Sequence, residues 1–160
     1  MLRPLLLLLG SMLIQFYHLT TTPLENALPK LLEKAFSGGY RALVVAETQA
    51  RVEQLNALLW TYDADSFLPH ASANEANPEA QPILLATGTE PLNKANLLVI
   101  TDGRVLGESD KDFERVLDIF DGNDANSVAA ARTRWTNYKN SGYEIAYFRQ
   151  VERGGWEKKT

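Results

Sequence analysis

The 160-residue sequence contains no cysteine and only two histidines, and these absences exclude several kinds of site. Without cysteine the chain has no disulfide framework, no thiolate metal site and no cysteine nucleophile. His18 and His70 are too few for a histidine metal centre, so we expect neither a metal nor a cofactor. Phosphate-binding glycine patterns are missing too, since neither GxxxxGKS/T nor GxGxxG follows the first predicted strand, residues 13–19.

The composition is typical of one domain with a packed core, and its charge is unevenly distributed. Hydrophobic residues make up 45% of the chain, the net charge is −4 and the isoelectric point is about 5.2. This balance disfavours a protein that coats nucleic acid by bulk charge, and we expect no tight direct binding to DNA. Basic residues nevertheless outnumber acidic ones in residues 130–160, which indicates a local site for an anionic partner.

The first eleven residues, MLRPLLLLLGS, precede the first strand pattern. One arginine followed by an apolar run resembles a short signal peptide, but the run is well below the ~20 residues of a transmembrane helix, and we expect no membrane association. Because Met12 stands directly before the strand, we interpret residues 1–11 as a leader added by an upstream start codon. A targeting segment or an apolar tail are the alternatives, and without targeting the protein is expected to be cytoplasmic.

From Met12 onward, strand and helix patterns alternate as in a parallel α/β sheet. Strands are predicted at residues 13–19, 41–46, 82–87 and 95–101, and helices at 23–36 and 48–60. A threonine is expected to cap each helix, one from residues 20–22 for the first and Thr48 for the second. The predicted fold class is α/β, a three-layer sandwich with a mostly parallel sheet.

The second half of the sequence contains two more helix patterns and one more strand pattern. Asp110 is expected to cap a helix that ends near Phe120, and Asp124 or Asn126 a helix that ends near residue 141. Residues 143–150 alternate in polarity, which predicts a last, antiparallel strand. Residues 61–81 read as a long irregular segment. The predicted division is a leader (1–11), one domain (12–151) and a polar tail (152–160).

The sequence offers no residues for catalysis. No serine stands in a nucleophile elbow, and no carboxylate pair has a spacing suited to acid–base chemistry. Asp102 follows an apolar strand as a magnesium-binding acid does in NTPases, but without a phosphate loop Asp102-Gly103 is better interpreted as a turn. We therefore expect a binding protein. A nucleotide-binding α/β enzyme and an exported binding protein are the alternatives.

The predicted helix at 126–141 combines cations with aromatic residues on one side. Arg132, Trp135 and Lys139 follow i, i+3, i+7 spacing. Arg134 lies next to this side of the helix, and Tyr138 lies about one turn after Trp135. Two cations that frame an apolar pocket can receive a carboxylate attached to a hydrophobic side chain. The alternative is that Trp135 and Tyr138 belong to the core and the basic residues form a solvated face.

Three blocks of sequence occur in register along the chain: Phe16-Tyr17-His18-Leu19, Leu59-Trp60 with Ser66-Phe67-Leu68-Pro69-His70, and Ala131-Arg132-x-Arg134-Trp135-x-x-Tyr138-Lys139-x-x-Gly142-Tyr143. Together they resemble the chi subunit of the bacterial DNA polymerase III clamp loader, from Met12 to the end without large gaps. The resemblance implies a nucleotide-binding or helicase-like topology lacking a phosphate loop, which agrees with the missing glycine patterns. It also implies an accessory role without an active site.

The resemblance implies two partners. Chi proteins bind the acidic, Phe-ended C-terminal tail of single-stranded DNA-binding protein, and they link it to the clamp loader through the psi subunit. Carried over by position, Arg132 would clamp the carboxylate, and the tail site would comprise Phe120, Arg132, Arg134, Trp135, Tyr138, Lys139 and Gly142. Contact with psi, or with a substitute clamp-loader subunit, would use Trp60, Phe67, Leu68, Pro69 and His70, unless these merely cap the sheet.

The chain departs from better-known chi sequences on the predicted helix. Val128 and Thr136 stand where those sequences carry lysines, and Trp135 replaces a tyrosine. Fewer cations predict weaker attraction to an acidic tail, unless Lys158 and Lys159 supply some of the missing charge.

Overall fold

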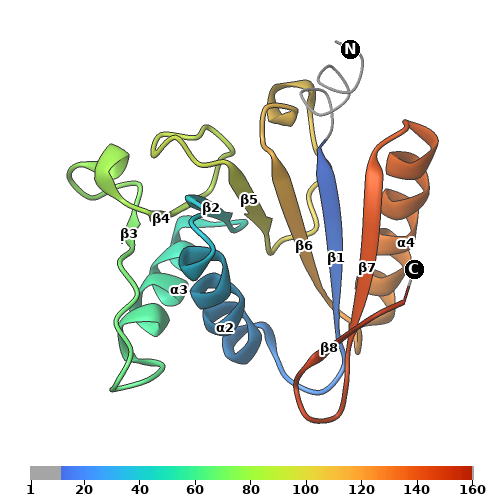
Figure 1. The fold of residues 1–160 in the computed structure, drawn as a ribbon, viewed down its shortest axis with the longest axis horizontal. Coiled ribbons are helices and arrows are strands. Elements are labelled where there is room, and N and C mark those ends of the chain that lie inside the picture. The colour runs from blue at the N-terminus through green and yellow to red at the C-terminus, as the bar shows by residue number, and fades with distance from the viewer. Residues whose placement is uncertain (1–11, 160) are drawn as a thin grey trace.

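The computed structural model describes residues 12–159, and the predicted leader therefore lies outside the described residues. The strands form one eight-stranded sheet in the order β3-β4-β2-β5-β6-β1-β7-β8 (Figure 1). Every neighbouring pair is parallel except β7 and β8, which are antiparallel. The strands are β1 (Leu13–Leu19), β2 (Ala42–Val45), β3 (Ala71–Ser72), β4 (Ile83–Ala86), β5 (Leu97–Ile100), β6 (Arg115–Asp121), β7 (Glu144–Gln150) and β8 (Trp156–Lys158). The helices are α2 (Leu24–Ser37), α3 (Gln49–Thr61) and α4 (Ala125–Asn140), with 3-10 turns at Pro78–Ala80 and Glu108–Asp110.

The sheet separates two apolar cores, as expected for the predicted three-layer sandwich. Helices α2 and α3 lie on one face and α4 on the other (Figure 1). Successive residues of the central strand β2 point to opposite faces, so Val44 belongs to the core under α2 and α3, and Val45 to the core that includes α4 residues. Both are fully buried, because strands with helices on both faces read as continuous apolar runs. The predicted fold class is confirmed.

The helix starts agree with the sequence prediction at two of three places. Thr48 accepts a hydrogen bond from the backbone N–H of Arg51, and Asp124 accepts one from Asn126, so both cap their helices. The predicted threonine cap of α2 is wrong, because Pro23 is the N-cap residue and makes no side-chain capping bond.

One predicted helix is wrong: residues 115–121 form strand β6 at the centre of the sheet, between β5 and β1. Phe113, Val116, Leu117 and Phe120 have helical spacing, and the charged Asp118 among them resembles a polar helix position. Asp118 is fully buried and paired with a cation from α4. Its burial was not evident from the sequence.

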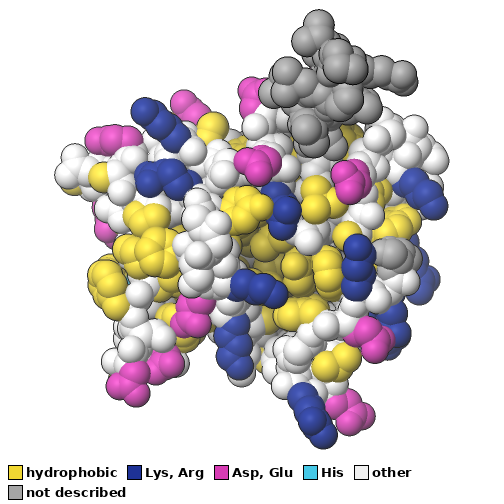
Figure 2. Space-filling view, viewed as in Figure 1, with side chains coloured by type: hydrophobic (Ala, Val, Ile, Leu, Met, Phe, Trp, Pro, Cys, Tyr) yellow, Lys and Arg dark blue, Asp and Glu magenta, His cyan; other side chains and the backbone are white. Residues whose placement is uncertain are grey.

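Strand β7 is parallel to β1, not antiparallel as predicted. The chain leaves β6, crosses one face as α4 and returns beside β1, a crossover that brings strands together in parallel. The tail predicted as polar contributes the antiparallel strand β8, whose Trp156 packs edge-on against Tyr17 at 4.9 Å between ring centroids. On the face of α2 and α3, hydrophobic side chains gather in a hollow flanked by lysines and arginines (Figure 2).

Candidate functional site

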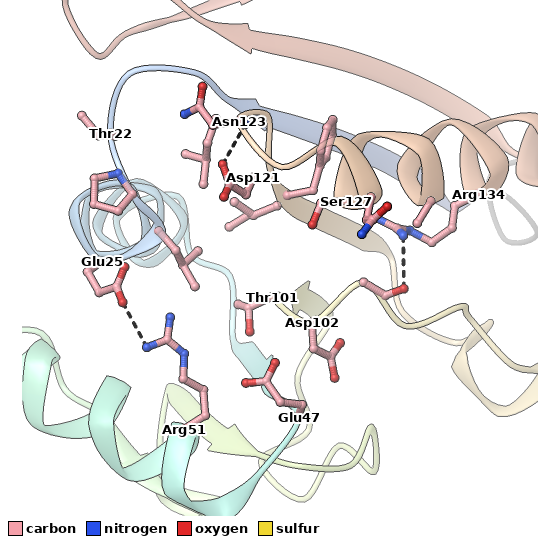
Figure 3. Close-up of a pocket in the computed structure, with 18 of the residues that line it drawn as sticks. Thr22, Glu25, Glu47, Arg51, Thr101, Asp102, Asp121, Asn123, Ser127 and Arg134 are labelled. Carbon is pink, nitrogen blue, oxygen red and sulfur yellow. Dashed lines mark hydrogen bonds and ion pairs between the residues drawn. The ribbon is translucent and has the colours of Figure 1, made fainter.

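A crevice of about 740 Å³ opens at the carboxyl ends of the parallel strands, the place where open α/β sheets bind ligands (Figure 3). Its charged side chains are largely paired within the protein. The Glu25 carboxylate and the Arg51 guanidinium are 3.0 Å apart. The pKa of Glu25 is lowered chiefly by a hydrogen bond to its own backbone N–H, and Arg51 lowers it further. Asp102, at the position of a metal-binding acid in NTPases, bonds Arg104 at 2.7 Å.

The loop after β1 does not offer its backbone to a phosphate. The N–H groups of Thr20, Thr21 and Thr22 all donate to the side-chain oxygen of Gln150, at 3.1, 3.0 and 3.1 Å. In phosphate-binding folds these N–H groups, at the start of the first helix, would hold the anion. Here they hold the end of β7 instead, which agrees with the missing glycine patterns.

Arg134 lines this crevice and has a structural partner. Its guanidinium grips the Asp118 carboxylate with two bonds of 2.7 and 2.9 Å and donates a third bond to the Gly103 carbonyl. The arginine side chain is 4% exposed and the aspartate side chain 1%. Burial raises the pKa of Asp118, and Arg134 opposes that increase. The pair therefore joins α4 to the middle of the sheet.

A second, more apolar pocket of about 380 Å³ lies between α4 and strands β1, β6 and β7. Its walls are mostly aromatic: Phe16 packs edge-on against Trp135 with centroids 5.6 Å apart, and His18 lies 4.8 Å from Phe120. The lining residues are Phe16, His18, Phe120, Val128, Ala131, Arg132, Trp135 and Tyr147. One cation, the exposed Arg132, belongs to this lining. The pocket fits an apolar side chain that carries a negative group.

His18 connects the pocket lining to its surrounding charges. Its Nδ1 bonds the Tyr147 hydroxyl, and its pKa lies below the ordinary value. Burial is the main cause, Arg149 and Arg132 add to it, and Asp121 acts in the opposite direction. The ring therefore lies in a region of net positive potential.

The structure brings only part of the predicted tail site into this pocket. Phe120, Arg132 and Trp135 line it together. Lys139 and Gly142 are exposed near the C-terminal end of α4 and are not part of its lining. Arg134 and Tyr138 face the sheet: Arg134 pairs with Asp118, and the buried Tyr138 hydroxyl accepts a 3.0 Å bond from the Leu106 N–H. Because consecutive residues turn by about 100°, Arg134 points roughly 200° away from Arg132.

Five lining residues were not predicted as site residues. Val128 and Ala131 are uncharged members of the same helix side, whereas Phe16, His18 and Tyr147 come from strands. The signal for these three is strand alternation, which places Phe16 with His18, and Ile145 with Tyr147, on the face covered by α4.

The five residues predicted for psi contact also come together, at the C-terminal end of α3. Trp60 is 52% exposed and Phe67 74%, with ring centroids 6.0 Å apart. His70 is buried beneath Trp60, with centroids 4.3 Å apart, and Leu68 is buried beside it. Figure 2 shows hydrophobic side chains gathered on the surface next to α3. Two exposed aromatic rings on a buried support are typical of an interface patch.

Comparison with known proteins decides the family. The family model for "DNA polymerase III chi subunit, HolC" matches residues 12–146. The chain belongs to the DNA polymerase III chi subunit family. A probable chi subunit from Rickettsia prowazekii is 31% identical over 84 residues, which is 52% of this chain and 51%, about half, of that relative. The chi subunit of Haemophilus influenzae is 26% identical over 82% of this chain and 93% of the relative, and that of Pseudomonas aeruginosa 29% identical over 72% and 79%.

A solved structure has a similar fold. The crystal structure of T4 UvsW superposes with a TM-score of 0.56 at 11% identity, over 87% of this chain and 41% of UvsW. At this identity the likeness concerns the fold alone. Membership of the chi family gives the chain an accessory role in DNA replication, as a subunit of DNA polymerase III. Among residues 12–159, no group of side chains is arranged to hold a metal, and no helix is long and apolar enough to cross a membrane.

Proposed function

We propose that this chain is a non-catalytic, cytoplasmic clamp-loader subunit that binds the acidic C-terminal tail of single-stranded DNA-binding protein and links it to DNA polymerase III. The observation that carries the proposal is the apolar pocket with Arg132 in its lining. A C-terminal phenylalanine presents a ring and a carboxylate separated by two carbons, Cβ and Cα, and the pocket offers aromatic walls and a guanidinium. Arg132 suits this role because its planar fork grips a carboxylate with two bonds.

Two features support binding over catalysis. The crevice at the carboxyl ends of the strands contains paired charges, and the N–H groups of the β1–α2 loop are bonded to Gln150. The acidic net charge also disfavours direct contact with DNA. The protein would therefore reach single-stranded DNA through its protein partner.

The test is a titration of a labelled C-terminal peptide of the cognate single-stranded DNA-binding protein, followed by fluorescence anisotropy at two salt concentrations. Saturable binding that weakens with salt is expected, and Arg132→Ala should weaken it about 10- to 100-fold, because a charge-assisted bond contributes roughly 1.5–3 kcal/mol. Lys30→Ala removes an exposed cation from α2, on the opposite face, and should bind like the wild type. Absence of binding at about 100 μM protein, an affinity weaker than about −5.5 kcal/mol, would contradict the proposal.

The patch of Trp60 and Phe67 supports the second half of the proposal, contact with psi or a substitute clamp-loader subunit. Its rings are exposed, and the buried His70 packs against Trp60. Phe67→Ser should leave the free energy of unfolding within about 0.5 kcal/mol of wild type, because the ring is mostly in solvent, yet abolish co-purification with the clamp loader. Retained tail-peptide binding by the same variant is the control. Unchanged co-purification would remove the patch from the proposal.

A further inference from the structure

Helix α4 supplies the apolar pocket with a single charge. Within the pocket lining, Val128 and Ala131 accompany Arg132 and are uncharged. Thr136, one turn beyond Arg132, is exposed and uncharged as well. An acidic tail carries several carboxylates, so a receptor with one cation leaves the others without a partner. A second cation therefore stands outside the lining, and Lys139, near the C-terminal end of the same helix, is one such exposed cation.

Strand β7 carries a cation in a suitable position. Residues 18 and 149 are direct neighbours in the parallel pairing of β1 and β7. Strand alternation puts Arg149 on the same face as Tyr147, which lines the pocket and bonds His18. Arg149 is exposed, and among residues 12–159 its side chain makes no hydrogen bond or ion pair. Its neighbour on β8, Glu157, is ion-paired with Lys159, and the more distant charge of Arg149 also contributes to lowering the pKa of that carboxyl.

The charges around His18 support this placement. The groups that act on its ring come from three elements, namely Arg132 on α4, Arg149 on β7 and Asp121 at the end of β6. Both arginines lower the pKa of His18 in addition to burial, and Asp121 raises it. The two guanidinium groups thus act on one imidazole from the helix and from the sheet.

We propose that Arg132 and Arg149 form a two-armed receptor for two carboxylates of one acidic peptide, with His18 between them. Arg132 lines the pocket and binds the terminal carboxylate of the residue whose side chain fills it. Arg149 stands outside the pocket lining and binds an acidic side chain further up the peptide. The inference rests on the proposed function and adds a residue from the sheet to a site otherwise built on one helix.

A proton effect follows from this arrangement. A bound carboxylate reduces the positive potential at His18 and therefore raises the pKa of its ring. Because the bound state then takes up protons, binding should tighten as the pH falls from about 7 to about 5.5, while the peptide carboxylates, with ordinary pKa values near 4, stay ionised. A site in which His18 is remote from the peptide would show no such tightening.

The experiment compares wild type, Arg132→Gln, Arg149→Gln and the control Lys30→Gln against three peptides: the native tail, a tail with upstream acids replaced by amides, and a tail with an amidated C-terminus. Arg149→Gln should weaken binding of the native tail about three- to tenfold. It should weaken the peptide with the amidated C-terminus equally, but should have no effect on the peptide whose upstream acids are amides. Arg132→Gln should weaken the upstream-amide peptide and should have no effect on the peptide with the amidated C-terminus. Such couplings report pairwise contact, because non-specific charge loss would weaken all peptides alike.

The possible outcomes separate the inference from the proposed function. If wild type binds the tail and Arg132→Gln weakens it, while Arg149→Gln matches Lys30→Gln, the receptor has one arm and the inference is overturned. If wild type binds no tail, both fail. An NMR titration of the His18 ring is an independent check without peptide: Arg149→Gln should raise its pKa, and an unchanged value would place Arg149 away from the site.

Discussion

Arg132 and Arg134 stand two positions apart on the same helix and have opposite surroundings. Arg134 is almost fully buried and bonded to both oxygens of Asp118 and to the Gly103 carbonyl. Arg132 is exposed, lines an apolar pocket and makes no ion pair among residues 12–159. One guanidinium stabilises the attachment of α4 to the sheet, whereas the other is available to a partner. A charge on this helix therefore acquires its role from the side on which it lies.

The two cavities differ in the same way. The crevice at the carboxyl ends of the strands is where open α/β sheets bind ligands, yet most of its charged side chains are ion-paired and the loop after β1 is bonded to Gln150. The smaller pocket on the other side of α4 has aromatic walls and a cation, Arg132, that makes no ion pair among residues 12–159. We infer that the binding chemistry left free by internal contacts lies on the other side of α4 from this crevice.

The largest effect is expected from removing the buried cation. Arg134→Ala leaves the Asp118 carboxylate uncompensated in the centre of the sheet, which should lower the free energy of unfolding by about 3–5 kcal/mol. Chemical denaturation followed by tryptophan fluorescence measures this directly. Arg132→Ala, two positions away, should stay within about 0.5 kcal/mol of wild type, since its side chain is exposed.

A double variant tests whether the loss of stability comes from the uncompensated charge of Asp118. Asp118→Asn combined with Arg134→Met removes both charges and should be less destabilised than Arg134→Ala alone, because a buried pair is itself only weakly stabilising. Equal stability of Arg134→Ala and Arg132→Ala would mean that the two arginines do not differ as the contacts indicate.

Much of the fold follows from local patterns in the sequence. The apolar runs of β2, β4 and β5 are fully or nearly fully buried on both faces, and Thr48 and Asp124 are caps that local sequence specifies. The error at β6 has a non-local cause, because Asp118 looks like a polar helix position until Arg134, sixteen residues later, is known to neutralise it. The parallel direction of β7 likewise depends on a crossover rather than on its own pattern.

The candidate site was predictable only where it lies on one element. Arg132 and Trp135 share a helix side, and spacing is enough to group them. His18 and Tyr147 are 129 residues apart, and the register of β1 beside β7 brings them together. Arg134 entered the predicted site through the family resemblance, and spacing could not correct this, because a sequence does not reveal which helix side faces the sheet when both sides carry cations.

The smallest effect is a pH dependence that belongs to the pocket and not to the crevice. Burial, then Arg149 and Arg132, hold the pKa of His18 below its ordinary value, and Asp121 opposes them. Below about pH 6.5 the unfolded chain therefore binds a proton that the folded chain binds less readily, so stability should fall as the pH decreases through this range. The difference between the denaturation midpoints at pH 7.5 and pH 5.5 should be smaller in His18→Gln than in wild type. This change should itself be smaller than the loss of stability caused by Arg134→Ala. Arg149→Gln should give an intermediate result, because it removes one of the charges that depress the pKa. Identical pH dependence in all three proteins would mean that the arginines do not act on His18, and the pocket would then lose the positive potential that distinguishes it from the internally paired crevice.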